Sequence, residues 1–144
     1  MQDVTADAAR RYLHGIWSAT RHLDDLLAQA EPSGRGLGFA ELILLEHIAH
    51  TDLSPSEIAA SMRLRDHAVS RLLGRLERAG DVRRAIADDD ARRRRLSLTP
   101  AGRDRLARAQ RYLGERLAPL LDDLGTHRLQ ALVEGIHRVV AAPS

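Results

Sequence analysis

The stretch from Ser54 to Gly102 limits the possible folds of this chain more than any other part of the sequence. It opens with Ser-Pro-Ser-Glu at residues 54–57, where the serine is placed to cap a helix and the proline to occupy its first position. The glutamate completes a capping box. This short helix is predicted to end near residue 62. After a turn at 63–65, a second helix is predicted over 66–79, because glycine follows at position 80.

Two strands are predicted next, over 82–87 and 93–98. In the second strand Leu96 and Leu98 alternate with Arg95 and Ser97, the period of a strand with one buried face. The polar residues 88–92 between them form the tip of a hairpin. Helix, turn, helix and hairpin in this order are typical of a winged helix-turn-helix. In that fold the second helix enters the DNA major groove and the hairpin lies beside it.

The positions of the arginines are more informative than their number. All 22 residues of the Lys+Arg total are Arg, a bias that a GC-rich genome also produces. Residues 63–95, however, hold eleven Arg against six Asp or Glu, a net charge of +5, so the remainder of this +2 chain sums to −3. A basic segment on a mildly acidic body indicates a polyanionic partner for that segment.

The rest of the chain suits a single unit with helical arms. Its 144 residues, 44% hydrophobic but only 3% aromatic, predict one domain with an aliphatic core. Helices are expected over 6–30 and 39–50, and Thr-Pro at 99–100 opens a last helical section that Gly125 divides. The fold class is therefore mainly α with a small β-hairpin wing (α+β). Without cysteine, and without an apolar run approaching about 18 residues, we expect no disulfide, no membrane partner and a cytoplasmic location.

Two motifs resemble the MarR family of bacterial transcription regulators. One is the helix sequence VSRLLGRLERAG at residues 69–80. The other is the wing, where the family pattern is Asp-x-Arg, a short spacer and Leu-Thr-x-x-Gly. The residues at those positions here are Asp90, Arg92, Leu98, Thr99 and Gly102. Length, element order and the two helical arms agree as well, so the resemblance extends over nearly the whole chain.

The resemblance implies a homodimer that represses transcription. Residues 1–34 and 103–144 would interlock with those of a second copy, while 35–102 would form the winged DNA-binding domain, all within one compact unit. Two such domains would bind a pseudo-palindromic operator in double-stranded DNA and release it when a small aromatic or anionic effector binds. The apolar stripes of the arms favour the dimer independently, because one small domain cannot cover them. Packing of these stripes within one chain is the alternative.

Candidate DNA contacts lie on the second helix and on the wing. Arg71 and Arg75 are four residues apart on its polar side, where arginine binds guanine in a bidentate manner or phosphate as a fixed cation. Position near the helix start favours Arg71 as the base reader. By resemblance, Arg92 is the wing-tip arginine of the minor groove, and Asp90 holds it extended. The full candidate set is Ser56, Arg65, His67, Ser70, Arg71, Arg75, Asp90, Arg92 and Arg94.

Each of these assignments has a competing interpretation. For Arg71 and Arg75 it is a solvated helix face with pairing four residues apart. For Ser56 it is plain capping rather than phosphate binding at a helix N-terminus. For the residues that the resemblance places around an effector cavity, it is the dimer core. Those residues are Tyr12, Ile16, Trp17, His47 and Tyr112.

We expect no metal site, no cofactor and no enzyme activity. The seven histidines include pairs on the first and second helices, but none has the spacing of a tight ligand motif. The sequence holds no glycine-rich phosphate loop, nucleophile elbow or HExxH motif. The alternative function is a winged-helix protein-interaction module without specific DNA binding. The exposed Arg71 and Arg75 disfavour it, because a protein-binding helix uses apolar or aromatic anchors.

Overall fold

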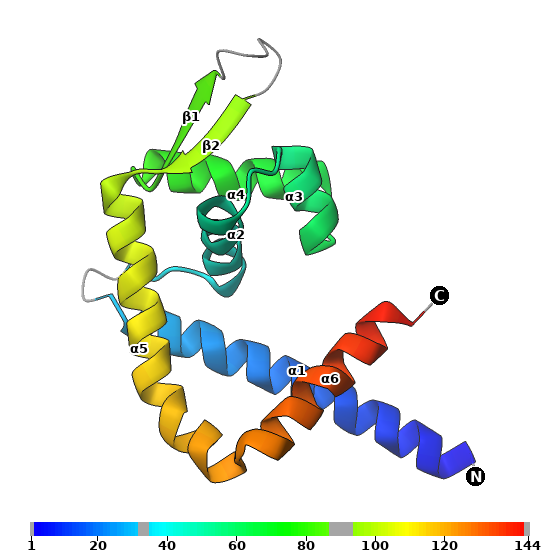
Figure 1. The fold of residues 1–144 in the computed structure, drawn as a ribbon. Coiled ribbons are helices and arrows are strands. Elements are labelled where there is room, and N and C mark those ends of the chain that lie inside the picture. The colour runs from blue at the N-terminus through cyan, green and yellow to red at the C-terminus, as the bar shows by residue number, and fades with distance from the viewer. Residues whose placement is uncertain (1, 32–34, 87–93, 143–144) are drawn as a thin grey trace.

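The computed structural model of the chain describes residues 2–31, 35–86 and 94–142 (Figure 1). Within these ranges the chain forms six helices and one hairpin. The helices are α1 (Gln2–Gln29), α2 (Phe39–His50), α3 (Pro55–Met62), α4 (Asp66–Arg78), α5 (Pro100–Leu124) and α6 (Thr126–Ala141). The strands are β1 (Val82–Ile86) and β2 (Arg94–Leu98). The predicted mainly α fold with a small hairpin wing is confirmed.

Two regions differ in how they are packed, and we name them the head and the arms. The head comprises residues 23–31, 35–86 and 94–113, and the arms comprise residues 2–22 and 114–142. Figure 1 shows α2, α3, α4 and the hairpin gathered in the head, with α5 leading away from it to α6. The N-terminal part of α1 and the whole of α6 extend to one side below the head.

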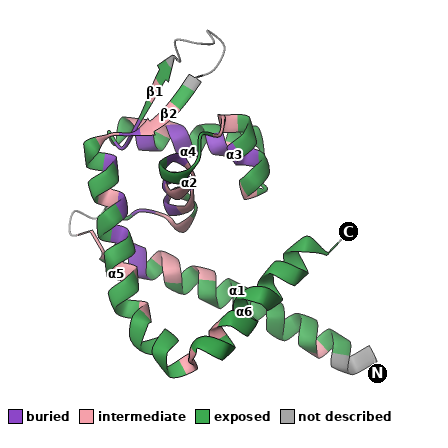
Figure 2. Ribbon diagram, in the orientation of Figure 1, coloured by how far each residue is buried: buried purple, intermediate pink, exposed green. Residues whose placement is uncertain are grey.

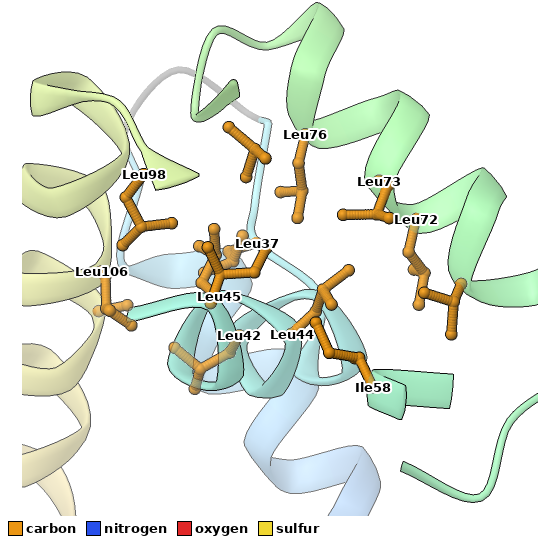
Figure 3. Close-up of a cluster of buried hydrophobic side chains, with 14 of the residues drawn as sticks. Leu37, Leu42, Leu44, Leu45, Ile58, Leu72, Leu73, Leu76, Leu98 and Leu106 are labelled. Atoms are coloured by element: carbon orange, nitrogen blue, oxygen red, sulfur yellow. The ribbon is translucent and has the colours of Figure 1, made fainter. Parts of the chain in front are cut away.

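The head is organised around an aliphatic core. Leu44 and Leu45 of α2, Ile58 of α3 and Leu73 of α4 are fully buried and belong to one cluster. Figure 3 shows leucines of α2, α4, α5 and β2 pointing toward one another. The buried members of this cluster are all Leu, Ile, Val or Ala, as the low aromatic content predicts. Burial of this much apolar surface is the main force that fixes α4 and the hairpin on the rest of the head.

Helix boundaries in the head follow from local capping. Ser54 accepts a hydrogen bond from the backbone N–H of Glu57, whose side chain in turn accepts from the backbone N–H of Ser54, so the predicted capping box is present. Thr99 caps α5 in a similar way, with a proline at the first position. Gly80 has a φ of +81°, which ends α4 close to the predicted place. The first helix begins at Gln2 rather than at residue 6, because polar residues before the apolar stripe also adopt helical structure.

The wing is a two-stranded antiparallel hairpin. Val82 lies opposite Leu98 and Ile86 opposite Arg94. Val82 and Leu98 are buried in the core cluster, and Leu96 packs against it, so one face of the hairpin is anchored to the head as predicted. The tip, residues 87–93, lies outside the described residues.

Most residues of the arms are exposed, whereas the buried residues gather in the head, as Figure 2 shows. The structure buries none of the described residues of α6. Large apolar side chains remain exposed along α1, the end of α5 and α6. They are Tyr12, Leu13, Ile16, Trp17, Leu120, Leu121, Leu132, Val133, Ile136, Val139 and Val140. None of the helices in the described part of the chain has the length and apolarity needed to cross a membrane.

Candidate nucleic-acid interface

The turn between α3 and α4 depends on one residue in a left-handed conformation. Arg63 has φ 54° and ψ 38°, and its backbone N–H points to the carbonyl oxygens of Ala59 and Ala60. Non-glycine residues rarely adopt this conformation, which here ends α3 and allows α4 to begin three residues later. The guanidinium of Arg63 also donates to the carbonyl oxygen of Val140 at 2.8 Å. The last turn of α6 therefore contacts the turn that positions α4.

Helix α4 has one buried face and one basic face, as the sequence predicts. Val69, Leu72, Leu73 and Leu76 are buried against the core. The opposite face exposes His67, Ser70, Arg71, Arg75 and Arg78. Because packing fixes the buried face, the polar face has a fixed direction toward solvent. The predicted candidates His67, Ser70, Arg71 and Arg75 therefore share one surface.

The other candidates near this surface come from the helix starts. Arg65 is the residue before α4, where it makes no side-chain capping bond, and it is exposed. Ser56 is exposed in the first turn of α3, while Ser54 provides the cap. Capping therefore leaves the Ser56 side chain unused, and its proposed phosphate contact stays a prediction.

A groove of about 670 Å³ runs along the basic face of α4. Its arginines are Arg71, Arg75 and Arg78, and its other lining residues are Ala40, Leu64, Ala68, Ser70, Leu72 and Gly74. Ala40 comes from the start of α2, so the groove lies between the two helices. Three cations along an open concave surface form a strongly positive strip that suits a polyanion.

The arginines around this groove differ in their acidic partners. Arg75 pairs with Glu41 of α2 at 3.6 Å, Arg84 of β1 with Glu77 of α4 at 2.6 Å, and Arg95 of β2 with Asp52 at 3.7 Å. None of these pairs lies within one element, and Asp52 belongs to the segment between α2 and α3. The competing interpretation expected pairing between residues of α4. In the structure, Arg75 and Glu77 pair instead with residues outside α4. In the described part of residues 63–95, no ion pair is formed by Arg63, Arg65, Arg71, Arg78 or Arg83.

The wing motif residues at the base of the hairpin have structural roles. The Thr99 hydroxyl accepts from the backbone N–H of Gly102 at 3.0 Å and donates to the carbonyl oxygen of Gly80 at 2.5 Å. A Cβ at Gly102 would collide with the backbone carbonyl of Asp81. Because only glycine allows this approach, the first turn of α5 locks onto the start of β1 and holds the wing beside α4.

A buried ion network behind the wing base was not predicted from the sequence. The Arg105 guanidinium donates to Asp81 at 2.5 Å and to Glu31 at 2.6 Å, and its side chain is only 12% exposed. It also donates to the carbonyl oxygen of Arg35 at 2.7 Å. Burial alone would lower the pKa of Arg105, but the hydrogen bonds and charges of Glu31 and Asp81 raise it above its ordinary value. The network thus joins the end of α1, the wing base and α5.

One segment of the head matches a known protein family. Residues 35–93, which run from the segment before α2 through the wing tip, match the model of the MarR family. This segment of the chain is therefore similar to the MarR family. No curated protein matches the chain.

Three solved structures have a similar fold over nearly the whole chain. The transcriptional regulator BldR from Sulfolobus solfataricus is 19% identical with a TM-score of 0.77, and the match covers 96% of each chain. Streptococcus pneumoniae FabT in complex with DNA is 18% identical with a TM-score of 0.74 over 94% of each chain. A mutant MarR from E. coli complexed with operator DNA is 23% identical with a TM-score of 0.72 over 92% of each chain. The arms therefore belong to the shared fold as well as the head.

The remaining candidates of the wing are Asp90, Arg92 and Arg94. Asp90 and Arg92 lie outside the described residues. The backbone of Arg94 begins β2, opposite Ile86, but its side chain is not among those described. Their predicted contacts with DNA stay predictions.

The five residues expected around an effector cavity lie on three helices. Tyr12, Ile16 and Trp17 are exposed on α1, and Trp17 shares a shallow hollow of about 220 Å³ with Leu13 and His14. The imidazole of His47 on α2 lies 2.9 Å from the Ser61 hydroxyl of α3. Tyr112 on α5 stacks under the Arg116 guanidinium, 4.9 Å from the ring centroid. The hollow at Trp17 includes none of the other four, so the effector cavity stays a prediction. No group of three His, Asp or Glu side chains suited to a metal ion occurs in the described part of the chain.

Proposed function

We propose that this chain is a sequence-specific DNA-binding transcription regulator. The observation that carries this proposal is the basic groove of α4, fixed by the core on one side and held next to the wing by Thr99 and Gly102. An α-helix fits the major groove of B-DNA, and exposed arginines on it provide both phosphate and base contacts. The similarity to structures of FabT with DNA and of MarR with operator DNA supports the same use here.

The proposal includes a cytoplasmic homodimer on a pseudo-palindromic operator. The exposed apolar side chains of the arms support this part, because many large apolar side chains left exposed on neighbouring helices mark an interaction site. A second copy offers the same surface, so burial is mutual. Two heads would then bind half-sites separated by one helical turn, roughly 34–36 Å.

We extend the proposal to repression that a small aromatic or anionic effector relieves. The exposed aromatic side chains of α1 support a flat ligand near the arms, but covering by the second copy is the competing use of the same side chains. Trp17 would be covered in both cases, either by the effector or by the second copy. Loss of operator binding in the presence of benzoate, with the dimer intact, would support the effector.

Selection of duplexes from a randomised library by the full-length chain tests the central claim. We expect an inverted repeat to be enriched, with two chains bound per site in sedimentation experiments. Binding should also weaken steeply as salt rises, because phosphate contacts release counterions. A protein-interaction module would enrich no repeat and show a shallow salt slope, and this result would reject the proposal in favour of that alternative.

A further inference from the structure

The two arginines at the centre of the basic face of α4 differ in one respect. Arg75 faces a carboxylate, since Glu41 Oε1 lies 3.6 Å from its Nη2, whereas Arg71 has no ion-pair partner within the described part of the chain. Glu41 belongs to the first turn of α2 and its side chain is only 17% exposed. The side chain of Arg75 is 58% exposed, so the guanidinium remains open to the groove.

This ion pair contributes little to folding. Exposed pairs typically add only about 0–1 kcal/mol, and at 3.6 Å the two side chains do not form a hydrogen bond. Its effect is instead on orientation, because the carboxylate attracts one edge of a guanidinium that is otherwise free to rotate. A planar guanidinium held from one edge has N–H groups on the other edge for a second partner.

The charge around each arginine decides whether it suits a phosphate or a base. A phosphate is bound by net positive charge, and the carboxylate of Glu41 lowers that charge at Arg75 but not at Arg71. The O6 and N7 atoms of guanine are neutral acceptors that need two donors in fixed positions. An oriented, charge-compensated arginine therefore suits guanine, and an uncompensated one suits phosphate.

We propose that Arg75 is the base-reading arginine of α4 and that Glu41 is its positioning residue. Arg71 is then the phosphate ligand. Position along the helix alone favours the opposite assignment, and the ion pair to α2 reverses it. This inference rests on the proposed DNA-binding function and specifies which residues give it sequence discrimination.

The test compares Glu41→Gln with Glu46→Gln. Both variants lie on α2 and remove one negative charge, but Glu46 accepts a hydrogen bond from Gln110 of α5 at 2.6 Å and is not paired with an arginine. Affinity is measured for the duplex selected by the wild type, for each single base-pair variant of it, and for a random duplex of equal length. Thermal unfolding of each variant shows whether the fold is retained.

Glu41→Gln should lose discrimination at one base pair of each half-site, by about tenfold, with little change in melting temperature. Its affinity for the random duplex should stay equal or rise about twofold to threefold, because a charge that repels phosphate is removed. Glu46→Gln should leave discrimination unchanged. Arg75→Ala should lose discrimination at the same base pair, and adding Glu41→Gln to it should have no further effect there.

Arg71→Ala should weaken binding to every duplex alike and lower the salt slope by about one. The assignment would be overturned if Arg71→Ala lost discrimination between base pairs while Glu41→Gln and Arg75→Ala both retained it. DNA binding itself would still be established by that result. An equal gain of affinity for all duplexes in Glu41→Gln would show that Glu41 only repels DNA, which also overturns it. A wild-type chain that selects no duplex would reject the proposed function itself, and this inference with it.

Discussion

The head and the arms are made of the same aliphatic residues but reach different degrees of burial. In the head, leucines of α2 and α4 such as Leu44 and Leu73 are fully buried by neighbouring elements. In the arms, Leu132, Ile136 and Val139 of α6 keep a third or more of their surface exposed. The head therefore buries its apolar side chains within one chain, whereas those of the arms need a second surface to become buried.

Helix α1 shows this difference within one element. Leu26 and Leu27, near its C-terminal end, are buried in the head, while Ile16 and Trp17, about three turns earlier, are exposed at 40% and 67%. A single apolar stripe thus passes from an intrachain core to an uncovered surface. Periodicity identifies the stripe but not the molecule that covers it.

The largest effect is expected from a charge placed in the arms. Ile136→Asp should convert the dimer into a monomer at micromolar concentration, because a buried carboxylate at the interface is costly. Operator affinity should then fall by at least about 100-fold, since the two half-sites are no longer bound as one unit. Sedimentation velocity and mobility shifts measure both. Gln130→Asp, which adds the same charge at an exposed polar position of α6, should retain the dimer. A dimeric Ile136→Asp would show that α6 faces solvent.

The next largest effect is expected in the core of the head. Leu73 is fully buried, so Leu73→Ala should lower the free energy of unfolding by about 2–5 kcal/mol through lost contacts and a cavity. Leu132 is 53% exposed, and Leu132→Ala should act on the dimer dissociation constant instead. Urea unfolding at several protein concentrations separates the two effects. Equal, concentration-independent losses would mean that the arms are covered within one chain.

Local sequence features predicted the fold. Contacts between residues far apart in the sequence were not predicted. The caps at Ser54 and Thr99 and the stop at Gly80 act within one helical turn, so their positions in the sequence were sufficient. The basic face of α4 followed from helical periodicity in the same way. The contact of Glu41 with Arg75 and that of Arg63 with Val140 join residues far apart in the chain, and no local pattern predicts such pairs.

The third prediction concerns the buried network that joins the end of α1, the wing base and α5. Arg105→Met leaves Glu31 and Asp81 without their shared cation, and Asp81 is only 5% exposed. Breaking a buried ion pair on one side typically costs about 3 kcal/mol or more, so we expect a loss near 3 kcal/mol in urea unfolding. Arg103→Met, an exposed position on the same helix, should change stability little. Equal effects of the two variants would show that the network adds nothing to stability.

The fourth prediction separates DNA binding from assembly. By resemblance to the MarR wing, Arg92→Ala should weaken operator binding by about 1–3 kcal/mol, the value of a good DNA contact. The dimer and the melting temperature should stay as in the wild type, because a wing tip contributes little burial. This pattern is the reverse of that expected for Leu73→Ala, which acts on stability first. Unchanged affinity in mobility shifts would show that the wing does not enter the DNA groove.

The smallest effect is expected at an exposed ion pair in the arms. Asp7 of α1 lies 2.6 Å from Arg10 and 2.7 Å from Arg11, whose side chains are 70% and 79% exposed. Such pairs contribute little, so Asp7→Asn should lower the free energy of unfolding by less than about 0.5 kcal/mol. The loss should disappear in about 1 M salt, which screens exposed charges. The loss in Arg105→Met should persist there, because buried charges are screened much less. Urea unfolding at low and high salt measures both. A large loss at Asp7 that salt leaves unchanged would mean that this part of α1 is already buried.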